Sequence, residues 1–496
     1  MAQLILLCVS ALSLTLACMR VENPPPSSSA EPSSDSQQAV WASEFFTVEP
    51  QSDDALANAR RMDSAGRTPD GQLALLSARD HMRRATTYHV NRAFAEAREH
   101  WQALIARYPE DTNVPAAMFG IGRSLYQERR NAEALPVFQK LGDTYPQTEP
   151  GRDGFYYVAA TLLRLGRAGE AAERYIEYIK RFPQGERIEN AYLNTIDSFR
   201  EAGRYEDALP WVERTRERFR GMPAATNALF ARLRLDVSRG DWQTAIRTSD
   251  ELMRASFARG VQTSTSEVAY LKAYSLERAG QKEAASAVYQ TIPDGINSYY
   301  GGMATIHLQS LGGAARSVAS RRSSRVQTDT VAARNDYPAP YREMILREAT
   351  KKNVDPRLIL AIMRQESGFN PSAKSNSAAR GLMQFVMDVA LKYAPQAGLG
   401  NLRDEDLYRP EVSIQLAAAY ISELSALFPG LPEAVAASYN GGEDNVARWV
   451  KRAVHDDPGI FASEVGFTET KDYVFKVMAN YRAYKRLYTE DLRPRR

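Results

Sequence analysis

The chain has 496 residues, which is long enough for two or three domains with hydrophobic cores of their own. Its 63 lysines and arginines stand against 60 aspartates and glutamates, and the formal net charge of +3 argues against nucleic acid as the main partner. The five histidines are scattered and form neither an HExxH motif nor a cluster with cysteine. We therefore expect no metal site and no bound cofactor.

Residues 1–18 carry the features of an export signal. An apolar run from Leu4 to Leu16 is too short to span a bilayer, and it is followed by Ala17 and Cys18. The segment resembles a bacterial lipoprotein signal, in which the bond after Ala17 is cleaved and Cys18 takes the lipid. The alternative is an ordinary secretory signal that releases a soluble periplasmic protein. Both interpretations predict a periplasmic protein, and the first adds a lipid anchor to a membrane.

Residues 19–75 are predicted to be a disordered tether and an entry segment. Their first half is rich in proline and serine, as in Asn23-Pro24-Pro25-Pro26-Ser27-Ser28-Ser29. Such a composition cannot bury enough apolar surface to become ordered. After a lipid anchor, this spacer would let the folded part stand away from the membrane.

Residues 76–309 repeat with a step of 37 residues. Glycines recur with this step at Gly166, Gly203 and Gly240, and each lies five residues before one of the recurring alanines, which are Ala97, Ala134, Ala171, Ala208 and Ala245. Each unit predicts two helices with a small residue at their close crossing and a glycine turn between them. The units resemble tetratricopeptide repeats, which implies an α-solenoid. A solenoid can bind a protein partner or hold another domain in place, and we favour the second role.

Residues 310–336 are predicted to be a solvated linker. They are rich in serine, alanine, threonine and arginine and show no apolar period. From Tyr337 the sequence favours helices again, without the 37-residue step, so we expect a separate domain over residues 337–490. No alternating pattern is long enough for a large sheet. The predicted fold class is therefore all-α.

Glu366 is the candidate catalytic residue of this last domain. A helix is predicted over Leu358–Ser367 with Asp355 as its N-cap, and Ile359, Ile362 and Glu366 share one of its faces. A carboxylate on an apolar face costs free energy unless it is paired or protonated. A protonated carboxyl beside a cleft can act as a general acid at neutral pH. A lone glutamate here could equally be a surface residue, so the neighbouring motifs decide.

Three further motifs follow Arg364-Gln365-Glu366-Ser367 in this domain, namely Gly381-Leu382-Met383-Gln384, Ala436-Ala437-Ser438-Tyr439-Asn440-Gly441-Gly442 and Glu469-Thr470-Lys471-Asp472-Tyr473-Val474. Each motif alone has a structural explanation, such as core filling or a turn. In this order they resemble the catalytic domain of soluble lytic transglycosylases, which are lysozyme-like enzymes that cleave peptidoglycan. The resemblance implies a lysozyme-like, mainly helical domain. Ala378 departs from the glycine that the family usually has, and Gly441 from its common alanine.

The resemblance implies a role for each matching residue. Glu366 would protonate the glycosidic oxygen between N-acetylmuramic acid and N-acetylglucosamine, and would then take the proton of the muramic acid C6 hydroxyl as a 1,6-anhydro ring closes. One carboxyl suffices because the substrate supplies its own nucleophile. The residues that would hold or surround the glycan strand are Ser375, Gln384 and Tyr439 near the scissile bond, Asn440 in the loop, Met383 in the cleft wall, and Glu469 and Tyr473 from the last motif.

Two alternatives to a lytic transglycosylase are kept open. The first is a hydrolase of the same fold that releases a reducing sugar. The second is a non-catalytic cell-wall protein that binds glycan strands and recruits partners through the solenoid. The joint presence of Glu366, Gln384 and Tyr439 argues against the second alternative, because binding alone does not need the acid.

Overall fold

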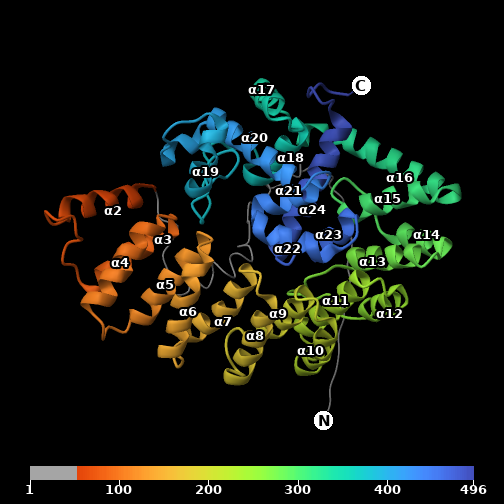
Figure 1. Ribbon diagram of the computed structural model, residues 1–496. Helices are drawn as coiled ribbons and strands as arrows, with labels where there is room; N and C mark the ends of the chain where they lie inside the picture. The colour runs from red at the N-terminus through yellow and green to blue at the C-terminus, as the bar shows by residue number, and fades with distance from the viewer. Residues whose placement is uncertain (1–52, 496) are drawn as a thin grey trace, which may run out of the picture.

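A computed structural model describes residues 53–495 of the chain, and regular structure in these residues consists of helices apart from isolated bridges. Helices from the first two thirds of the chain form a curved array, and the C-terminal helices lie across its open side (Figure 1). The all-α class is confirmed. The predicted signal segment, including Cys18, lies outside the described residues. None of the described helices combines the length and the apolar character needed to cross a membrane.

The solenoid is a series of consecutive helices that each pack against the next one. Its helices are α3 (Ala78–Val90), α4 (Phe94–Arg107), α5 (Val114–Gln127), α6 (Asn131–Thr144), α7 (Glu149–Arg164), α8 (Ala168–Arg181), α9 (Ile188–Glu201), α10 (Tyr205–Arg218), α11 (Pro223–Ser238), α12 (Trp242–Leu252), α13 (Thr265–Arg278), α14 (Lys282–Thr291) and α15 (Tyr299–Leu311).

The 37-residue period is the spacing of the second helix of each pair. Helices α4, α6, α8, α10 and α12 begin at Phe94, Asn131, Ala168, Tyr205 and Trp242, each 37 residues after the one before. The five recurring alanines lie one turn inside these helices and are fully buried. A larger side chain would hold the two helices of a pair apart, so the alanine fixes their close approach.

A residue with left-handed backbone conformation forms the turn within each pair. Gly166, Gly203 and Gly240 have φ of 74°, 71° and 70°. In the first two pairs the same step falls on Arg92 and Arg129, whose φ values are 60° and 63°. This conformation is free for glycine but costs a residue with a Cβ roughly 1–2 kcal/mol. Arg92 and Arg129 therefore have strained backbones, and the turn alone does not explain why arginine stands at these two positions.

Helix α2 (Asp53–Gly66) lies in the entry segment, beyond the proline- and serine-rich residues predicted to be the tether, which fall outside the described residues. Leu56 and Ala59 of α2 are buried, and the buried Asp63 accepts hydrogen bonds from Tyr88 and His100 of the first repeat. The helix owes its place to these contacts with the solenoid. Its own sequence has too few apolar residues to predict it.

Helix α16 (Gly313–Ala332) occupies the predicted solvated linker, which is thus a packed helix. It packs against α15 and α24, and Ala319 and Val326 are buried. The guanidinium of Arg322 donates to the carbonyl oxygens of Ile292 and Gly301 at 2.7 and 3.2 Å. Small residues and backbone-directed arginines hold the helix in place, which is why no apolar period marks it in the sequence.

The C-terminal domain follows a short 3₁₀ turn at Arg334–Asp336. At the centre of the domain, helix α18 packs against α24 and α20. The elements of the domain are α17 (Arg342–Lys352), α18 (Pro356–Ser367), α19 (Met387–Ala397), the 3₁₀ helix η2 (Asp404–Tyr408), α20 (Pro410–Leu427), α21 (Pro432–Gly441), α22 (Glu443–Ala453), α23 (Pro458–Glu464) and α24 (Thr468–Leu487).

The two halves of the solenoid meet this domain differently. From α11 onward, buried apolar residues of the solenoid and of the C-terminal domain form one continuous cluster. Tyr299 of α15, for example, stacks on Phe475 of α24 with ring centroids 5.0 Å apart. The repeats before α11 have a separate apolar cluster that includes no residue of the C-terminal domain. The second half is therefore joined to the domain by a core, and the first half is not.

His307 of α15 lies at the joint between the second half and the C-terminal domain. Its imidazole contacts Glu277 of the solenoid at 2.8 Å and Asp457, the N-cap of α23, at 3.0 Å. Burial alone lowers the pKa of His307, but the two carboxylates outweigh it and raise the pKa to about 9. The imidazolium between two carboxylates therefore links both parts at neutral pH.

Replacing His307 by glutamine is expected to destabilise the protein by at most about 3 kcal/mol at about pH 6, because the folded pKa lies above the ordinary value of 6.5. A raised histidine pKa stabilises fully below 6.5, and this contribution disappears as the pH rises through about 9. Melting temperatures of both proteins, measured from about pH 6 to about pH 9.5, should converge. His455→Gln is the control, because His455 contacts the carbonyl oxygen of Val237. A difference in melting temperature between His307→Gln and the wild type that stays constant from about pH 6 to about pH 9.5 would contradict the raised pKa of His307.

Candidate active site

Helix α18 carries Glu366 close to its C-terminal end. Asp355 caps the helix as predicted, because its side chain accepts a hydrogen bond from the backbone N–H of Arg357 at 2.8 Å. Ile359 and Ile362 are fully buried, whereas Glu366 on the same face keeps partial exposure to solvent. The apolar face thus fixes the helix, and the carboxyl emerges at the edge of the core.

Tyr473 of α24 is the direct partner of the acid. The Tyr473 hydroxyl donates to Glu366 Oε1 at 2.5 Å, and the tyrosine itself is buried. The contact crosses the interface between α18 and α24. It therefore fixes the position of the carboxyl relative to the last motif.

The carboxyl of Glu366 is protonated at neutral pH. Burial raises the pKa of Glu366 to about 8, the hydrogen bond from Tyr473 lowers it, and the negative charge of Glu469 raises it further. Desolvation disfavours the charged form of an acid, and a nearby like charge acts in the same direction. A carboxylic acid that keeps its proton at pH 7 and still reaches solvent can donate that proton to a substrate.

Ser375 and Gln384 lie in the loop between α18 and α19. Ser375 Oγ accepts hydrogen bonds from the backbone N–H groups of Ser377 and Ala379 at 3.2 and 3.1 Å. Gln384 Nε2 donates to two carbonyl oxygens of the same loop at 3.1 and 2.9 Å. Both side chains therefore shape the loop. Ala378 has φ of 61°, a conformation in which the glycine usual for the family is free of strain.

Gly381 and Met383 anchor this loop in the domain. Gly381 has φ of 75°, and a Cβ there would lie 1.9 Å from the carbonyl oxygen of Leu407, so no other residue fits. Ser367, next to Glu366, donates through its hydroxyl to the carbonyl oxygen of Leu382 at 2.8 Å. The Met383 side chain is fully buried, so its place in a cleft wall stays a prediction.

Tyr439 and Asn440 connect the third motif to the other three. The Tyr439 hydroxyl donates to the carbonyl oxygen of Met383 at 2.9 Å. Burial raises the pKa of Tyr439, and the charge of Glu366 adds to this, which places the phenol near the acid. Asn440 Oδ1 accepts a hydrogen bond from the Thr470 hydroxyl at 2.6 Å, beside Glu469. The four motifs therefore meet around Glu366.

Arg380 and Asp53 also shape the loop, and the sequence analysis missed both. Arg380 is buried and donates to the carbonyl oxygen of Ala378 at 2.8 Å, while its backbone pairs with Phe385. Asp53 of α2 accepts from Arg380 at 2.7 Å and from Lys374 and Tyr408, both at 2.8 Å. No local pattern marks Asp53, because its partners lie more than 300 residues away.

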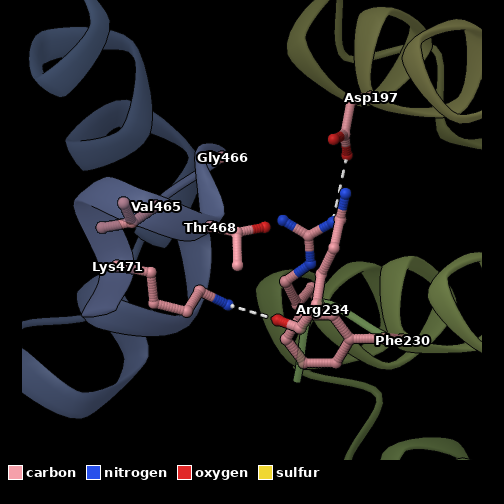
Figure 2. Close-up of a pocket in the computed structure, with 8 residues that line it drawn as sticks. Asp197, Phe230, Arg234, Val465, Gly466, Thr468 and Lys471 are labelled. Carbon is pink, nitrogen blue, oxygen red and sulfur yellow. Dashed lines mark hydrogen bonds and ion pairs between the residues drawn. The ribbon is translucent and has the colours of Figure 1, made fainter. Parts of the chain in front are cut away.

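A small hollow lies at the interface between the solenoid and the C-terminal domain. Arg234 and Asp197 line it from the solenoid, and Lys471 and Thr468 line it from the other side (Figure 2). None of its lining residues is a predicted site residue. Among the described residues, no group of three or more histidine, cysteine, aspartate or glutamate side chains is placed to hold a metal ion.

The raised pKa of Glu366 predicts that Glu366→Gln stabilises the protein at alkaline pH. A raised acid pKa stabilises the fold fully below the ordinary value of 4.5, and this contribution is lost as the pH rises through about 8. Glutamine avoids the cost of ionisation, so the variant should be more stable by roughly 3 kcal/mol at about pH 7. Melting temperatures at about pH 5 and about pH 8 measure the effect. Glu343→Gln, an exposed glutamate of α17, is the control. Equal pH profiles for Glu366→Gln and the wild type would contradict a buried, protonated acid.

Comparison with known proteins supports the division into a repeat region and a C-terminal domain. A profile of the transglycosylase SLT domain matches residues 343–459, and tetratricopeptide repeat profiles match residues 82–147 and 159–223. Tyr473 lies beyond the SLT match. A putative soluble lytic murein transglycosylase of Haemophilus influenzae is 34% identical over 163 residues, which are 31% of this chain and 27% of that protein.

The soluble lytic murein transglycosylase of Escherichia coli K12 is 31% identical over 157 residues, which are 31% of this chain and 24% of that protein. The matched part thus spans about a quarter of these relatives. A solved inactive mutant of the lytic transglycosylase Slt from Pseudomonas aeruginosa covers 91% of this chain and 93% of its own, with a TM-score of 0.46 and 18% identity. The chain therefore carries a transglycosylase SLT domain, preceded by tetratricopeptide repeats.

Proposed function

We propose that the protein is a peptidoglycan lytic transglycosylase, which cleaves the β-1,4 bond between N-acetylmuramic acid and N-acetylglucosamine. The observation that carries this proposal is Glu366, a partly exposed carboxyl with a pKa of about 8 at the meeting point of four motifs. The nearby carboxylate of Glu469 raises the pKa of Glu366 further, so Glu366 is the carboxyl that keeps its proton. This arrangement suits a substrate that provides its own nucleophile.

In the proposed reaction, Glu366 first donates its proton to the glycosidic oxygen, and the bond to the muramic acid C1 breaks. The resulting carboxylate then takes the proton of the C6 hydroxyl as this oxygen bonds to C1 and closes the 1,6-anhydro ring. The Tyr473 hydroxyl can stabilise the carboxylate between the two steps, because it already donates to it. A tethered hydroxyl gains effective molarity worth roughly 7–11 kcal/mol in favourable geometry.

The glycan strand is proposed to lie along the loop of Ser375, Met383 and Gln384 on one side of the acid and Tyr439 and Asn440 on the other, with Glu469 and Tyr473 at the last motif. The hydrogen bonds of Ser375 and Gln384 within their loop support a role in presenting its backbone to the sugar. The hydroxyl of Tyr439 supports the same loop through Met383. Binding would therefore depend on loop shape as much as on single side chains.

Glu366→Gln should lower the release of muropeptides from purified sacculi by about 10²–10⁴-fold, which is the usual contribution of a general acid. Glu343→Gln is the matched control and should retain full activity. Mass spectrometry of the wild-type products should show anhydro sugars, one water lighter than reducing sugars. Reducing ends would support the hydrolase instead. Glycan binding by the wild type without any cleavage would support the non-catalytic alternative.

We also propose a periplasmic location with a lipid anchor on Cys18, based on the apolar run and Ala17 that precede it. Cys18→Ala should then move the protein from the membrane fraction to the soluble periplasmic fraction, because the single attachment would be lost. Fractionation followed by immunoblotting measures this. An unchanged distribution would contradict the anchor.

The solenoid is proposed to act chiefly as a scaffold for the C-terminal domain, and recruitment of a protein partner is the second candidate. Side chains of α9 already pair with that domain, since Glu201 accepts from Arg448 at 2.7 Å and Arg200 donates to Glu464 at 2.6 Å. The second pair is buried. These contacts occupy surface that a partner would otherwise need.

A further inference from the structure

The first repeats contact the C-terminal domain through ion pairs. Their apolar cluster ends within the solenoid, as described above. Figure 1 shows α2 and α3 at one end of the curved array, next to α19 of the C-terminal domain. Asp53 of α2 and the turn residues after α3 and α5 place charged side chains on that domain, and the contacted segments flank the motifs around Glu366.

Arg92 and Arg129 make two of these contacts from the strained turns of the first two pairs. Arg92 donates through Nε and Nη2 to the two carboxylate oxygens of Asp388 at 2.9 and 2.6 Å. Arg129 pairs with the two oxygens of Glu443 at 2.5 and 2.9 Å. Two parallel bonds between a guanidinium and a carboxylate fix both distance and orientation.

Arginine replaces glycine at the two turns whose own turn residue contacts the C-terminal domain. The later pairs keep Gly166, Gly203 and Gly240 at this step, and their turns are free of strain. Arg92 and Arg129 adopt the same conformation against their preference. Backbone strain of this kind persists where surrounding contacts impose it, and here the contact is the ion pair with the domain.

Asp53 makes the third contact, on the loop of Ser375 and Gln384 itself. Its carboxylate accepts hydrogen bonds from Lys374 and Arg380, which lie on either side of Ser375, and Gln384 follows Arg380 by four residues. Burial raises the pKa of Asp53, but these cations outweigh it and lower the pKa to about 2, so the carboxylate stays ionised. The N-terminal helix is thereby fastened to the loop beside the acid.

The contacted residues lie close in sequence to the substrate motifs. Asp388 follows Gln384 by four residues, and Glu443 follows Asn440 by three. Between Asn440 and Glu443, the backbone at Gly442 lies so close to Arg129 that a Cβ would be 2.8 Å from the guanidinium. The guanidinium of Arg129 thus lies against the end of the third motif.

We infer that Asp53, Arg92 and Arg129 are positioning residues, which hold the loops of Ser375–Gln384 and Tyr439–Asn440 at the spacing that a glycan strand requires. This inference rests on the proposed function and extends it, because it assigns part of the substrate site to the first repeats. An ionic contact suits this role, since its geometry is directional while its net contribution to stability is small.

The test is the double variant Arg92→Gly and Arg129→Gly, measured in the full chain. Glycine removes both ion pairs and also relieves both turns, so the melting temperature should stay the same or rise. The kcat/KM for muropeptide release should nevertheless fall about ten- to a hundredfold, mainly through KM, because displaced loops lose substrate binding. A purely structural role would lower the melting temperature and leave KM unchanged.

Two further variants complete the test. Arg167→Ala removes an arginine that pairs with Glu170 inside the solenoid, and it should leave kcat/KM at the wild-type value. Arg92→Asp should lower kcat/KM, and combining it with Asp388→Arg should restore most of the loss, because the pair is rebuilt with reversed charges. A double glycine variant with wild-type KM, or a charge reversal without rescue, would overturn the inference.

A failure of the positioning role can be distinguished from a failure of the proposed enzyme activity. If the wild type releases no muropeptides, the proposed enzyme is wrong, and the same variants are compared by sedimentation with purified sacculi. The double glycine variant is then expected to bind about tenfold more weakly than the wild type, since the same loops would hold the glycan. Equal sedimentation would overturn the positioning role as well.

Discussion

The hydrogen bond between Tyr473 and Glu366 is the contact on which the site depends. It joins α18 to α24, which come from opposite ends of the C-terminal domain, and it does so at the carboxyl that we propose as the general acid. Burial keeps that carboxyl protonated, and the phenol limits how far its pKa rises. In the proposed reaction, loss of the tyrosine would make the protonated acid a weaker proton donor, because its pKa would lie further from neutrality.

The remaining motifs are arranged around this contact through backbone carbonyls. Tyr439 and Ser367 both donate to carbonyl oxygens of the segment Leu382–Met383. Gly381 lets that segment pass against η2, where a Cβ would collide with a carbonyl oxygen. The site is thus built from one acid and a loop whose path is determined by its backbone.

The sequence predicted those features that come from local or periodic patterns. The buried alanines and left-handed glycines of the repeats follow from the 37-residue step, and the cap at Asp355 and the partly buried Glu366 follow from one helix face. Helices α2 and α16 were not predicted, because distant partners rather than their own apolar pattern hold them. Asp388 and Glu443 lie near the motifs in the sequence, but only the fold brings Arg92 and Arg129 to them.

The two halves of the solenoid show how one repeat can serve two purposes. From α11 onward, where the repeats share a hydrophobic core with the C-terminal domain, the turn at Gly240 keeps glycine, and burial of apolar surface holds the domain. In the repeats before α11, which have a separate core, two turns keep glycine, whereas the first two carry arginine although the backbone conformation favours glycine. The period of a repeat is maintained by packing within the solenoid, so a departure from it marks a residue whose partner lies elsewhere. In this chain both departures contact the domain that carries the acid.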